Sequence, residues 1–178
     1  YEQILFAHKA ASFRYEPLGV IAVITPWNFP FAIPMVELAA CLAAGNTVVL
    51  KPASATARVG LAIGELCRRA GLPPGVVNVV TASGSDVDHL LEHPGVAKIL
   101  FTGSVEVGSH VMRTASKNVT PFVLELGGKD PMLVLADADV ERAANVAVEW
   151  AMRNAGQICM SVERVFELTK IDPWFLVQ

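Results

Sequence analysis

The feature that most constrains this chain is a regular alternation of short, apolar, β-branched runs with longer helical patterns. Runs that are apolar at nearly every position are typical of strands buried on both faces. Strands that alternate with helices form a parallel sheet, because each helix returns the chain to the edge from which the previous strand began. The sequence therefore predicts an α/β fold, an open parallel sheet with helices on both faces.

The expected elements can be assigned to residue ranges. The expected strands are Val20–Thr25, Thr47–Lys51, Val76–Val80, Val96–Phe101, Phe122–Leu126 and Met132–Leu135. The expected helices are Ile33–Ala44, Thr56–Ala70, Ser85–Glu92, Val105–Ala115 and Val140–Arg153. Two helix ends are marked by glycines, Gly45 and Gly71, the second followed by prolines.

Composition narrows the function classes. The 178 residues are enough for one domain, or for one domain and part of another. The chain is 53% hydrophobic and only 17% charged, and chains this apolar often bury surface against a partner. The richest apolar region, 19–50, is interrupted by prolines, Asn28 and Glu37, so no run reaches the ~20 residues that a membrane span needs. A net charge of −3 with scattered basic residues predicts no binding to nucleic acid or to a membrane.

Cysteine and histidine usage indicates the compartment and argues against a metal site. Three widely spaced cysteines do not form a disulfide framework and favour a reducing, cytoplasmic location. His89 and His93 are four residues apart and could share a helix face, as metal ligands do. Pro94 and Gly95 follow at once, however, and no third ligand stands nearby, so we predict no metal site.

Loops that follow the expected strands carry polar residues suited to a binding crevice. In "TPWNFP", Asn28 could donate an N–H to a developing oxyanion, or it could satisfy a local turn. Lys51 ends an apolar strand and could bind the ribose or phosphate of a nucleotide, or be a surface lysine. In "FTGSVEVG", Gly103 and Ser104 begin a helix, which favours phosphate but is also an ordinary N-cap.

Two residues are candidates for the chemistry itself. Glu125 lies in an apolar strand before two glycines, where burial would raise its pKa and suit it to acid–base catalysis. The alternative is an edge-strand glutamate that faces water. Cys159 follows Gly156 and Gln157 and has no amphipathic helix to bury it, whereas Cys41 and Cys67 lie on apolar helix faces and are expected to pack. Cys159 is therefore the candidate nucleophile.

Six motifs, in this order, resemble those of the aldehyde dehydrogenase superfamily: "PWNFP", "GNTVVLKP", "GLPPGVVNVV", "FTGSVEVG", "LELGGKDP" and "NAGQICMSVERV". The resemblance runs from about Phe13 to Phe166. It implies a Rossmann-like dinucleotide-binding domain over 19–127. An oligomerisation-type strand and linker would precede it over 1–18, and the beginning of a second, catalytic α/β domain would follow over 128–178.

The resemblance also implies roles for individual residues. Cys159 would attack an aldehyde, Asn28 and the Cys159 N–H would hold the oxyanion, and Glu125 would activate the water that hydrolyses the thioester. The substrate would be a small-molecule aldehyde, and further copies of the chain would form a dimer or tetramer through residues 11–17. The cofactor would be NAD or NADP, bound by Pro26, Trp27, Lys51, Ser54, Gly84, Thr102, Gly103, Ser104, Val107, Gly108, Leu126 and Gly127.

The chain departs from the family pattern in three places. Ser54 stands where NAD-preferring members usually carry a glutamate, so we expect NADP to be accepted, because serine does not repel a 2′-phosphate. Glu37 stands where many members have a lysine. After Phe166 the likeness fades, and the resemblance implies that most of the family's catalytic domain has no counterpart in these 178 residues. Two alternatives therefore stay open: a non-catalytic nucleotide-binding fragment, and a thiol esterase without a redox step.

Overall fold

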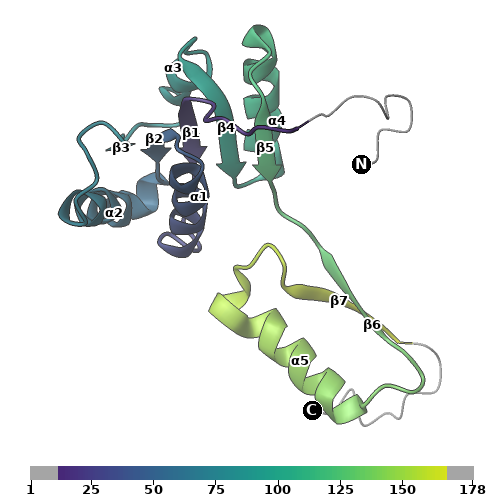
Figure 1. Ribbon diagram of the computed structural model, residues 1–178. Helices are drawn as coiled ribbons and strands as arrows, with labels where there is room; N and C mark the ends of the chain where they lie inside the picture. Colours follow the sequence, from purple (N-terminus) through teal and green to yellow (C-terminus); the bar gives the residue numbers. More distant parts are fainter. Residues whose placement is uncertain (1–11, 168–178) are drawn as a thin grey trace.

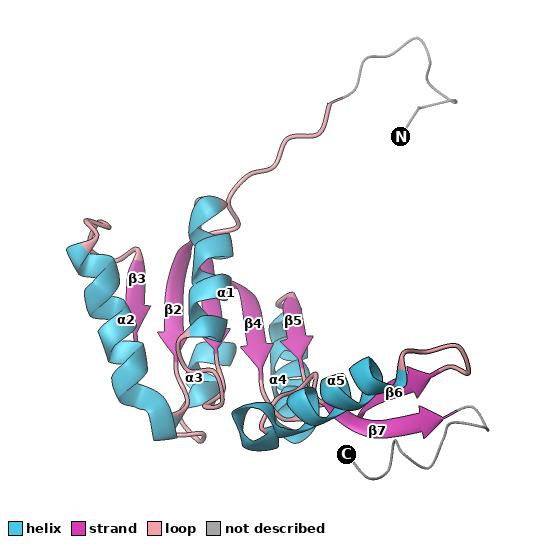
Figure 2. Ribbon diagram, turned by 90° about the horizontal axis from the view of Figure 1, so that it is seen from below, coloured by secondary structure: helices cyan, strands magenta, loops and turns pink. Residues whose placement is uncertain are grey.

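The computed structural model describes residues 12–167, which form two units joined by the segment between β5 and β6 (Figure 1). The larger unit contains a five-stranded sheet in the order β3-β2-β1-β4-β5. All its neighbouring strands are parallel, and in Figure 2 their arrows point the same way. The predicted α/β class with an open parallel sheet is confirmed. The strands are β1 (Val20–Ile24), β2 (Thr47–Lys51), β3 (Val77–Val79), β4 (Val96–Thr102) and β5 (Phe122–Glu125).

Helices pack on both faces of this sheet because the side chains of β1 alternate between them. Ile21 and Val23 belong to one buried cluster, with residues of α1 and α2 such as Leu38. Ala22 belongs to the other, with residues of α3 and α4 such as Val111. The helices are α1 (Ala32–Ala43), α2 (Ala57–Arg69), α3 (Val87–Leu91) and α4 (Val105–Ala115), and a 3₁₀ turn, η2 (Ser54–Thr56), leads into α2.

The strand order reverses at β1, and this reversal positions the site. β1 lies between β2 and β4, with Ile24 opposite Lys51 on one side and opposite Phe101 on the other. The carboxyl ends of the three strands therefore meet at one edge. In an open parallel sheet, the crevice outside such a reversal is where ligands bind.

The smaller unit is a two-stranded parallel sheet with one helix: β6 (Asp130–Val134), α5 (Val140–Met152) and β7 (Val162–Glu167). Asp139 caps α5, since its side chain accepts the N–H of Arg142 at 3.0 Å. The sequence did not predict β7. Charged residues occupy half of its positions and most of it is exposed, so it has no apolar run and forms a strand through pairing with β6.

Residues 12–18 precede the sheet and have no regular secondary structure; the N–H groups of Leu18 and Gly19 bind Asn46 Oδ1 at 2.7 and 3.0 Å. Of the expected oligomer strand at 11–17, residue 11 lies outside the described part. The remainder pairs with no strand of that part. Between residues 12 and 167, no helix is both long and apolar enough to cross a membrane.

Candidate active site

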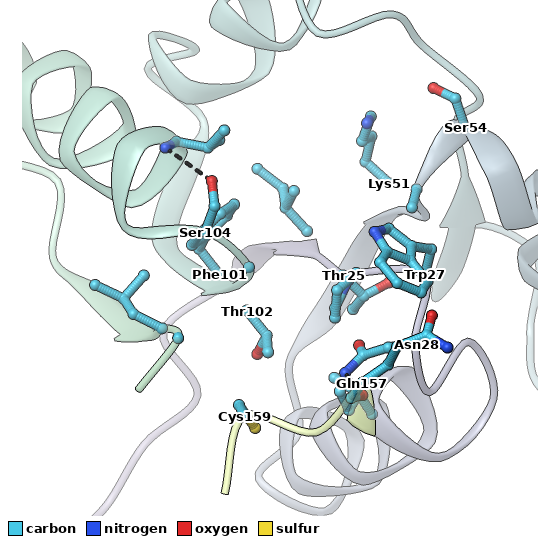
Figure 3. A pocket seen from close by; sticks show the side chains of 18 of the residues that line it. Thr25, Trp27, Asn28, Lys51, Ser54, Phe101, Thr102, Ser104, Gln157 and Cys159 are labelled. Carbon is cyan, nitrogen blue, oxygen red and sulfur yellow. Dashed lines mark hydrogen bonds between the residues drawn. The ribbon is translucent and has the colours of Figure 1, made fainter. Parts of the chain in front are cut away.

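A cleft of about 630 Å³ opens at the carboxyl edge of the sheet, beside the reversal at β1 (Figure 3). The ends of β1, β2 and β4 form its floor, the start of α4 forms one wall, and the segment that ends at Cys159 closes one end. Most of the residues predicted to bind cofactor or substrate line this cleft: Pro26, Trp27, Asn28, Lys51, Ser54, Gly84, Thr102, Gly103, Ser104, Val107, Leu126, Gly127 and Cys159.

The wall at α4 has the features of an anion site. Ser104 has an extended backbone and caps the helix, its Oγ accepting the N–H of Val107 at 3.2 Å. The other N–H groups of a first helical turn have no intrahelical partner, and the helix dipole adds positive potential there. Trp27, Val107 and Leu126 add apolar surface to the lining of the same cleft. The cleft therefore suits a ligand that carries both phosphate and flat rings.

Lys51 and Ser54 lie in the part of the cleft near Trp27, away from Cys159 (Figure 3). Lys51 is 9% exposed, and burial lowers the pKa of its ammonium group. Across residues 12–167, no carboxylate forms an ion pair with it. Ser54 is exposed at the start of η2. A polar ligand can therefore reach a cation and a hydroxyl here without displacing a protein carboxylate.

At the other end, Cys159 presents an exposed thiol, whereas Cys41 and Cys67 are buried in the core. Asn28 is held to the segment that carries Cys159: its Nδ2 donates to the carbonyl of Gln157, two residues before the cysteine, at 2.8 Å. Asn154 Nδ2 donates in turn to the carbonyl of Asn28 at 3.1 Å. The arrangement places a soft nucleophile and an amide donor at one site, which is what addition to a carbonyl group requires.

The predicted burial of Glu125 is wrong. Glu125 is exposed and does not line the cleft, because β5 is the edge strand of the sheet. It lies next to Thr102 in the strand register. Gly108 does not line the cleft either. It is buried in α4, where an added Cβ would lie 2.5 Å from Leu126 Cδ2, so its small size lets α4 approach Leu126 closely.

Glu37 of α1 is linked to the cleft by a hydrogen bond with Thr102: Thr102 Oγ1 donates to Glu37 Oε1 at 2.8 Å. Burial raises the pKa of Glu37; the hydrogen bond from Thr102 lowers it and the charge of Glu125 raises it further. Its second oxygen, Oε2, is buried without a hydrogen-bond partner among the described residues. A carboxyl group so placed favours its protonated form.

Sequence reasoning missed several lining residues, among them Thr25, Phe101 and Gln157. Thr25 Oγ1 is buried and has no partner within residues 12–167. The one available signal for Thr25 was a hydroxyl at the end of an otherwise apolar strand.

One of the two histidines considered as metal ligands forms a local contact. His93 Nδ1 accepts the N–H of Gly95 at 3.0 Å, a contact within its own turn. In the described range, no three His, Cys, Asp or Glu residues gather as metal ligands.

Comparison with known proteins gives consistent matches. The family model described as "Aldehyde dehydrogenase family" matches residues 2–176. Betaine aldehyde dehydrogenase 1 of Oryza sativa subsp. japonica is 46% identical over 166 residues, which are 90% of this chain and 32% of that protein. Cytosolic 10-formyltetrahydrofolate dehydrogenase of Homo sapiens is 48% identical over 165 residues, 92% of this chain and 18% of that protein. The chain thus spans about a third or less of the length of these curated relatives.

Solved structures match over the same extent. An NADP-dependent enzyme of E. coli has a TM-score of 0.88 at 44% identity, covering 91% of this chain and 34% of that one. The NAD⁺ complex of an aldehyde dehydrogenase from Bacillus cereus has a TM-score of 0.88 at 40% identity, covering 92% of this chain and 34% of that one.

Proposed function

The chain belongs to the aldehyde dehydrogenase family, and from that premise we propose that it carries the nucleotide site and the nucleophile of an NAD(P)-dependent enzyme that oxidises an aldehyde to a carboxylic acid. The observation that carries the proposal is the meeting of Asn28 and Cys159 at one end of a cleft whose other parts suit a dinucleotide. We further propose that copies of the chain associate as a dimer or tetramer through residues 11–17.

The volume and the lining residues of the cleft both support a dinucleotide as its ligand. The volume of the cleft, about 630 Å³, is in the range of sites for organic cofactors. The Ser104 cap and the first turn of α4 offer donors for the pyrophosphate, and Lys51 and Ser54 offer a cation and a hydroxyl for the adenosine ribose. Pro26, Trp27, Val107 and Leu126 would contact the flat rings. A nicotinamide held there would supply the hydride acceptor for the oxidation.

The protein's own residues would act in sequence. The Cys159 thiolate attacks the aldehyde carbon, and its Sγ–C bond forms as the carbonyl oxygen becomes an oxyanion. An amide nitrogen carries two N–H donors, so Asn28 Nδ2 can bind the Gln157 carbonyl with one and the oxyanion with the other. After oxidation, a thioester remains on Cys159. Glu125 would accept a proton from the water that hydrolyses it, which releases the acid and restores the thiol.

A second candidate function is favoured by the position of Glu125. Because this residue is exposed and outside the lining of the cleft, the chain can hold nucleotide and thiol together without a base at the thioester. In that case it is a nucleotide-binding fragment with slow or absent turnover.

The experiment is to incubate the chain with propanal and either NAD⁺ or NADP⁺ and to follow NAD(P)H by absorbance. Propanal-dependent NAD(P)H formation that Cys159→Ser abolishes supports the proposal. Cofactor binding without NAD(P)H formation supports the fragment. Hydrolysis of p-nitrophenyl acetate without any aldehyde oxidation indicates a thiol esterase and contradicts the proposal.

A further inference from the structure

The segment that leads to Cys159 has an unusual backbone. Three consecutive residues lie in the left-handed region: Asn154 at φ 51°, Ala155 at φ 57° and Gly156 at φ 77°. Glycine adopts this conformation at no steric cost, and asparagine tolerates it. For alanine it is unfavourable, because the Cβ comes too close to a backbone carbonyl oxygen. Such a run persists where neighbouring contacts hold it, and it is common at functional sites.

The contacts that hold it come from side-chain amides. Gln157 binds back onto Asn154 twice, through its backbone N–H and through Nε2, both to the Asn154 carbonyl at 3.2 Å. Asn154 Nδ2 reaches the Gln157 carbonyl at 3.4 Å and the Asn28 carbonyl at 3.1 Å. The turn therefore closes on itself and on the loop after β1.

The Gln157 carbonyl also sets the orientation of the Asn28 side chain. It accepts from Asn28 Nδ2 at 2.8 Å, while Asn28 Oδ1 is buried without a partner in the described residues. A flipped amide would place Oδ1 against a carbonyl oxygen, with two acceptors in contact and no proton between them. The carbonyl thus keeps the N–H donors of Asn28 on the side of the Gln157 backbone, in the segment that carries Cys159.

These contacts are the structural link between the two units at the site. The helices and strands of the smaller unit pack mainly on one another, within residues 130–167. Asn28 belongs to the larger unit and Cys159 to the segment between α5 and β7 of the smaller one. The relative position of amide donor and thiol therefore depends on how the turn at 154–157 meets the Asn28 loop.

We infer that Asn154 is a positioning residue: by binding the backbone carbonyl of Asn28 and supporting the Gln157 carbonyl that orients the Asn28 amide, it holds the oxyanion donor and the nucleophile in register. The contacts define an amide clasp made of Asn28, Asn154 and Gln157. Asn154 need not touch substrate. The inference rests on the proposed roles of Asn28 and Cys159, and its test separates the clasp from those roles.

The test uses two variants and a matched control. Asn154→Asp keeps the size of the side chain and its tolerance of a left-handed backbone but removes both N–H donors. Asn154→Gly keeps the backbone accessible and removes the side chain, so it covers the case in which the aspartate fails to fold. The control is Asn118→Asp, since Asn118 Nδ2 also donates to a backbone carbonyl distant in sequence, that of Glu92 at 2.8 Å, and neither residue lines the cleft.

Two reactions of Cys159 distinguish positioning from general disruption. Alkylation by iodoacetamide needs only an accessible thiolate, whereas the adduct formed by reversible addition of propanal is stabilised further by the oxyanion donor. We expect both Asn154 variants to alkylate within about twofold of the unaltered chain, while the propanal concentration that half-protects Cys159 rises about tenfold. Asn118→Asp should change neither. Equal protection by propanal in the Asn154 variants and the unaltered chain would overturn the inference.

Hydrogen exchange provides a readout that does not depend on the proposed function. If the clasp joins the two units, both Asn154 variants should speed exchange about fivefold or more in peptides covering 25–33 and 152–161 together. Faster exchange in 152–161 alone would overturn the clasp. If propanal does not protect Cys159 even in the unaltered chain, the proposed function is rejected, and hydrogen exchange then decides the clasp by itself.

Discussion

Among single residues, Ser54 is the one at which we propose that the cleft discriminates between NAD and NADP. Ser54 lines the cleft in the same part as Lys51, which no carboxylate of the described residues neutralises. A 2′-phosphate placed there would meet a cation and a hydroxyl and no negative charge. We propose that the absence of a carboxylate at this position would allow NADP to bind.

Ser54→Glu should therefore weaken NADP binding relative to NAD binding. A carboxylate close to a 2′-phosphate repels it, and we expect the ratio of NADP to NAD affinity to fall at least about tenfold. Titration of tryptophan fluorescence with each cofactor measures both constants. Ser54→Gln is the matched control, with the size of glutamate and no charge. If the glutamine variant shifts the ratio as far as the glutamate variant, charge at position 54 does not set the preference.

Glu37 makes a residue-level prediction about pH. Because burial raises its pKa above 4.5, the native state binds this proton more tightly than the unfolded state does. That stabilisation is fully present below the unfolded pKa and is lost as the pH rises through the folded pKa. Glutamine cannot ionise. The Tm of Glu37→Gln minus the Tm of the unaltered chain should therefore be about 2–4 °C larger at pH ~8 than at pH ~4.

Glu65→Gln is the control for this prediction. A hydrogen bond from Arg68 lowers the pKa of Glu65, so its ionised form is the stabilised one and the effect of pH has the opposite sign. Thermal unfolding of the three proteins at the two pH values measures the contrast. A difference between Glu37→Gln and the unaltered chain that stays constant with pH would show that Glu37 is not held in its protonated form.

At the scale of elements, the packing of α2 against the end of β2 supports the position of Lys51. Gly60 of α2 faces Pro52, and an added Cβ would lie 2.4 Å from Pro52 Cγ. The proline ring cannot rotate away, so the helix or the β2 end must move.

We expect Gly60→Ala to lower the free energy of unfolding by about 1–2 kcal/mol, since overpacking outweighs the gain in helix propensity. Gly84→Ala is the matched control: no atom lies within 4 Å of its added Cβ, and its stability should change by less than about 0.5 kcal/mol. Urea unfolding measures both. A Gly60→Ala variant as stable as Gly84→Ala would mean that α2 does not constrain Pro52.

The elements also show how far the sequence could predict this molecule. Apolar runs located the strands of the main sheet, because burial on both faces leaves a strong pattern. The exposure of Glu125 could not be predicted from this pattern. Its strand is apolar, and only the strand order shows that β5 lies at the edge of the sheet. β7 was missed because Glu163 and Arg164 interrupt any apolar run, and its pairing with β6 is a contact over distance. The amide clasp depends on backbone carbonyls, which leave no trace in composition.

At the scale of the whole molecule, the described residues form a five-stranded parallel sheet with its helices and a small second unit that exposes several apolar side chains. Leu133, Met152 and Phe166 of the second unit are 69%, 72% and 50% exposed. The chain also spans only 32% of the length of a relative such as betaine aldehyde dehydrogenase 1. Even so, the nucleotide-type wall, Asn28 and Cys159 meet within the described residues. We propose that a nucleotide bound in this cleft changes the reactivity of the Cys159 thiol in the chain as it stands.

Competitive alkylation tests this claim most directly. The chain is treated with limiting iodoacetamide, alone and with NAD or NADP, and the label is located by mass spectrometry, with Cys159→Ser as the control for assignment. Cys41 and Cys67 are 6% and 8% exposed and serve as internal references; burial raises the pKa of Cys41. We predict that Cys159 reacts at least about tenfold faster than Cys41 or Cys67. A cofactor should change the alkylation rate of Cys159 and leave the rates of the other two cysteines unchanged. Equal labelling of all three cysteines, or a Cys159 rate indifferent to both cofactors, would contradict the account.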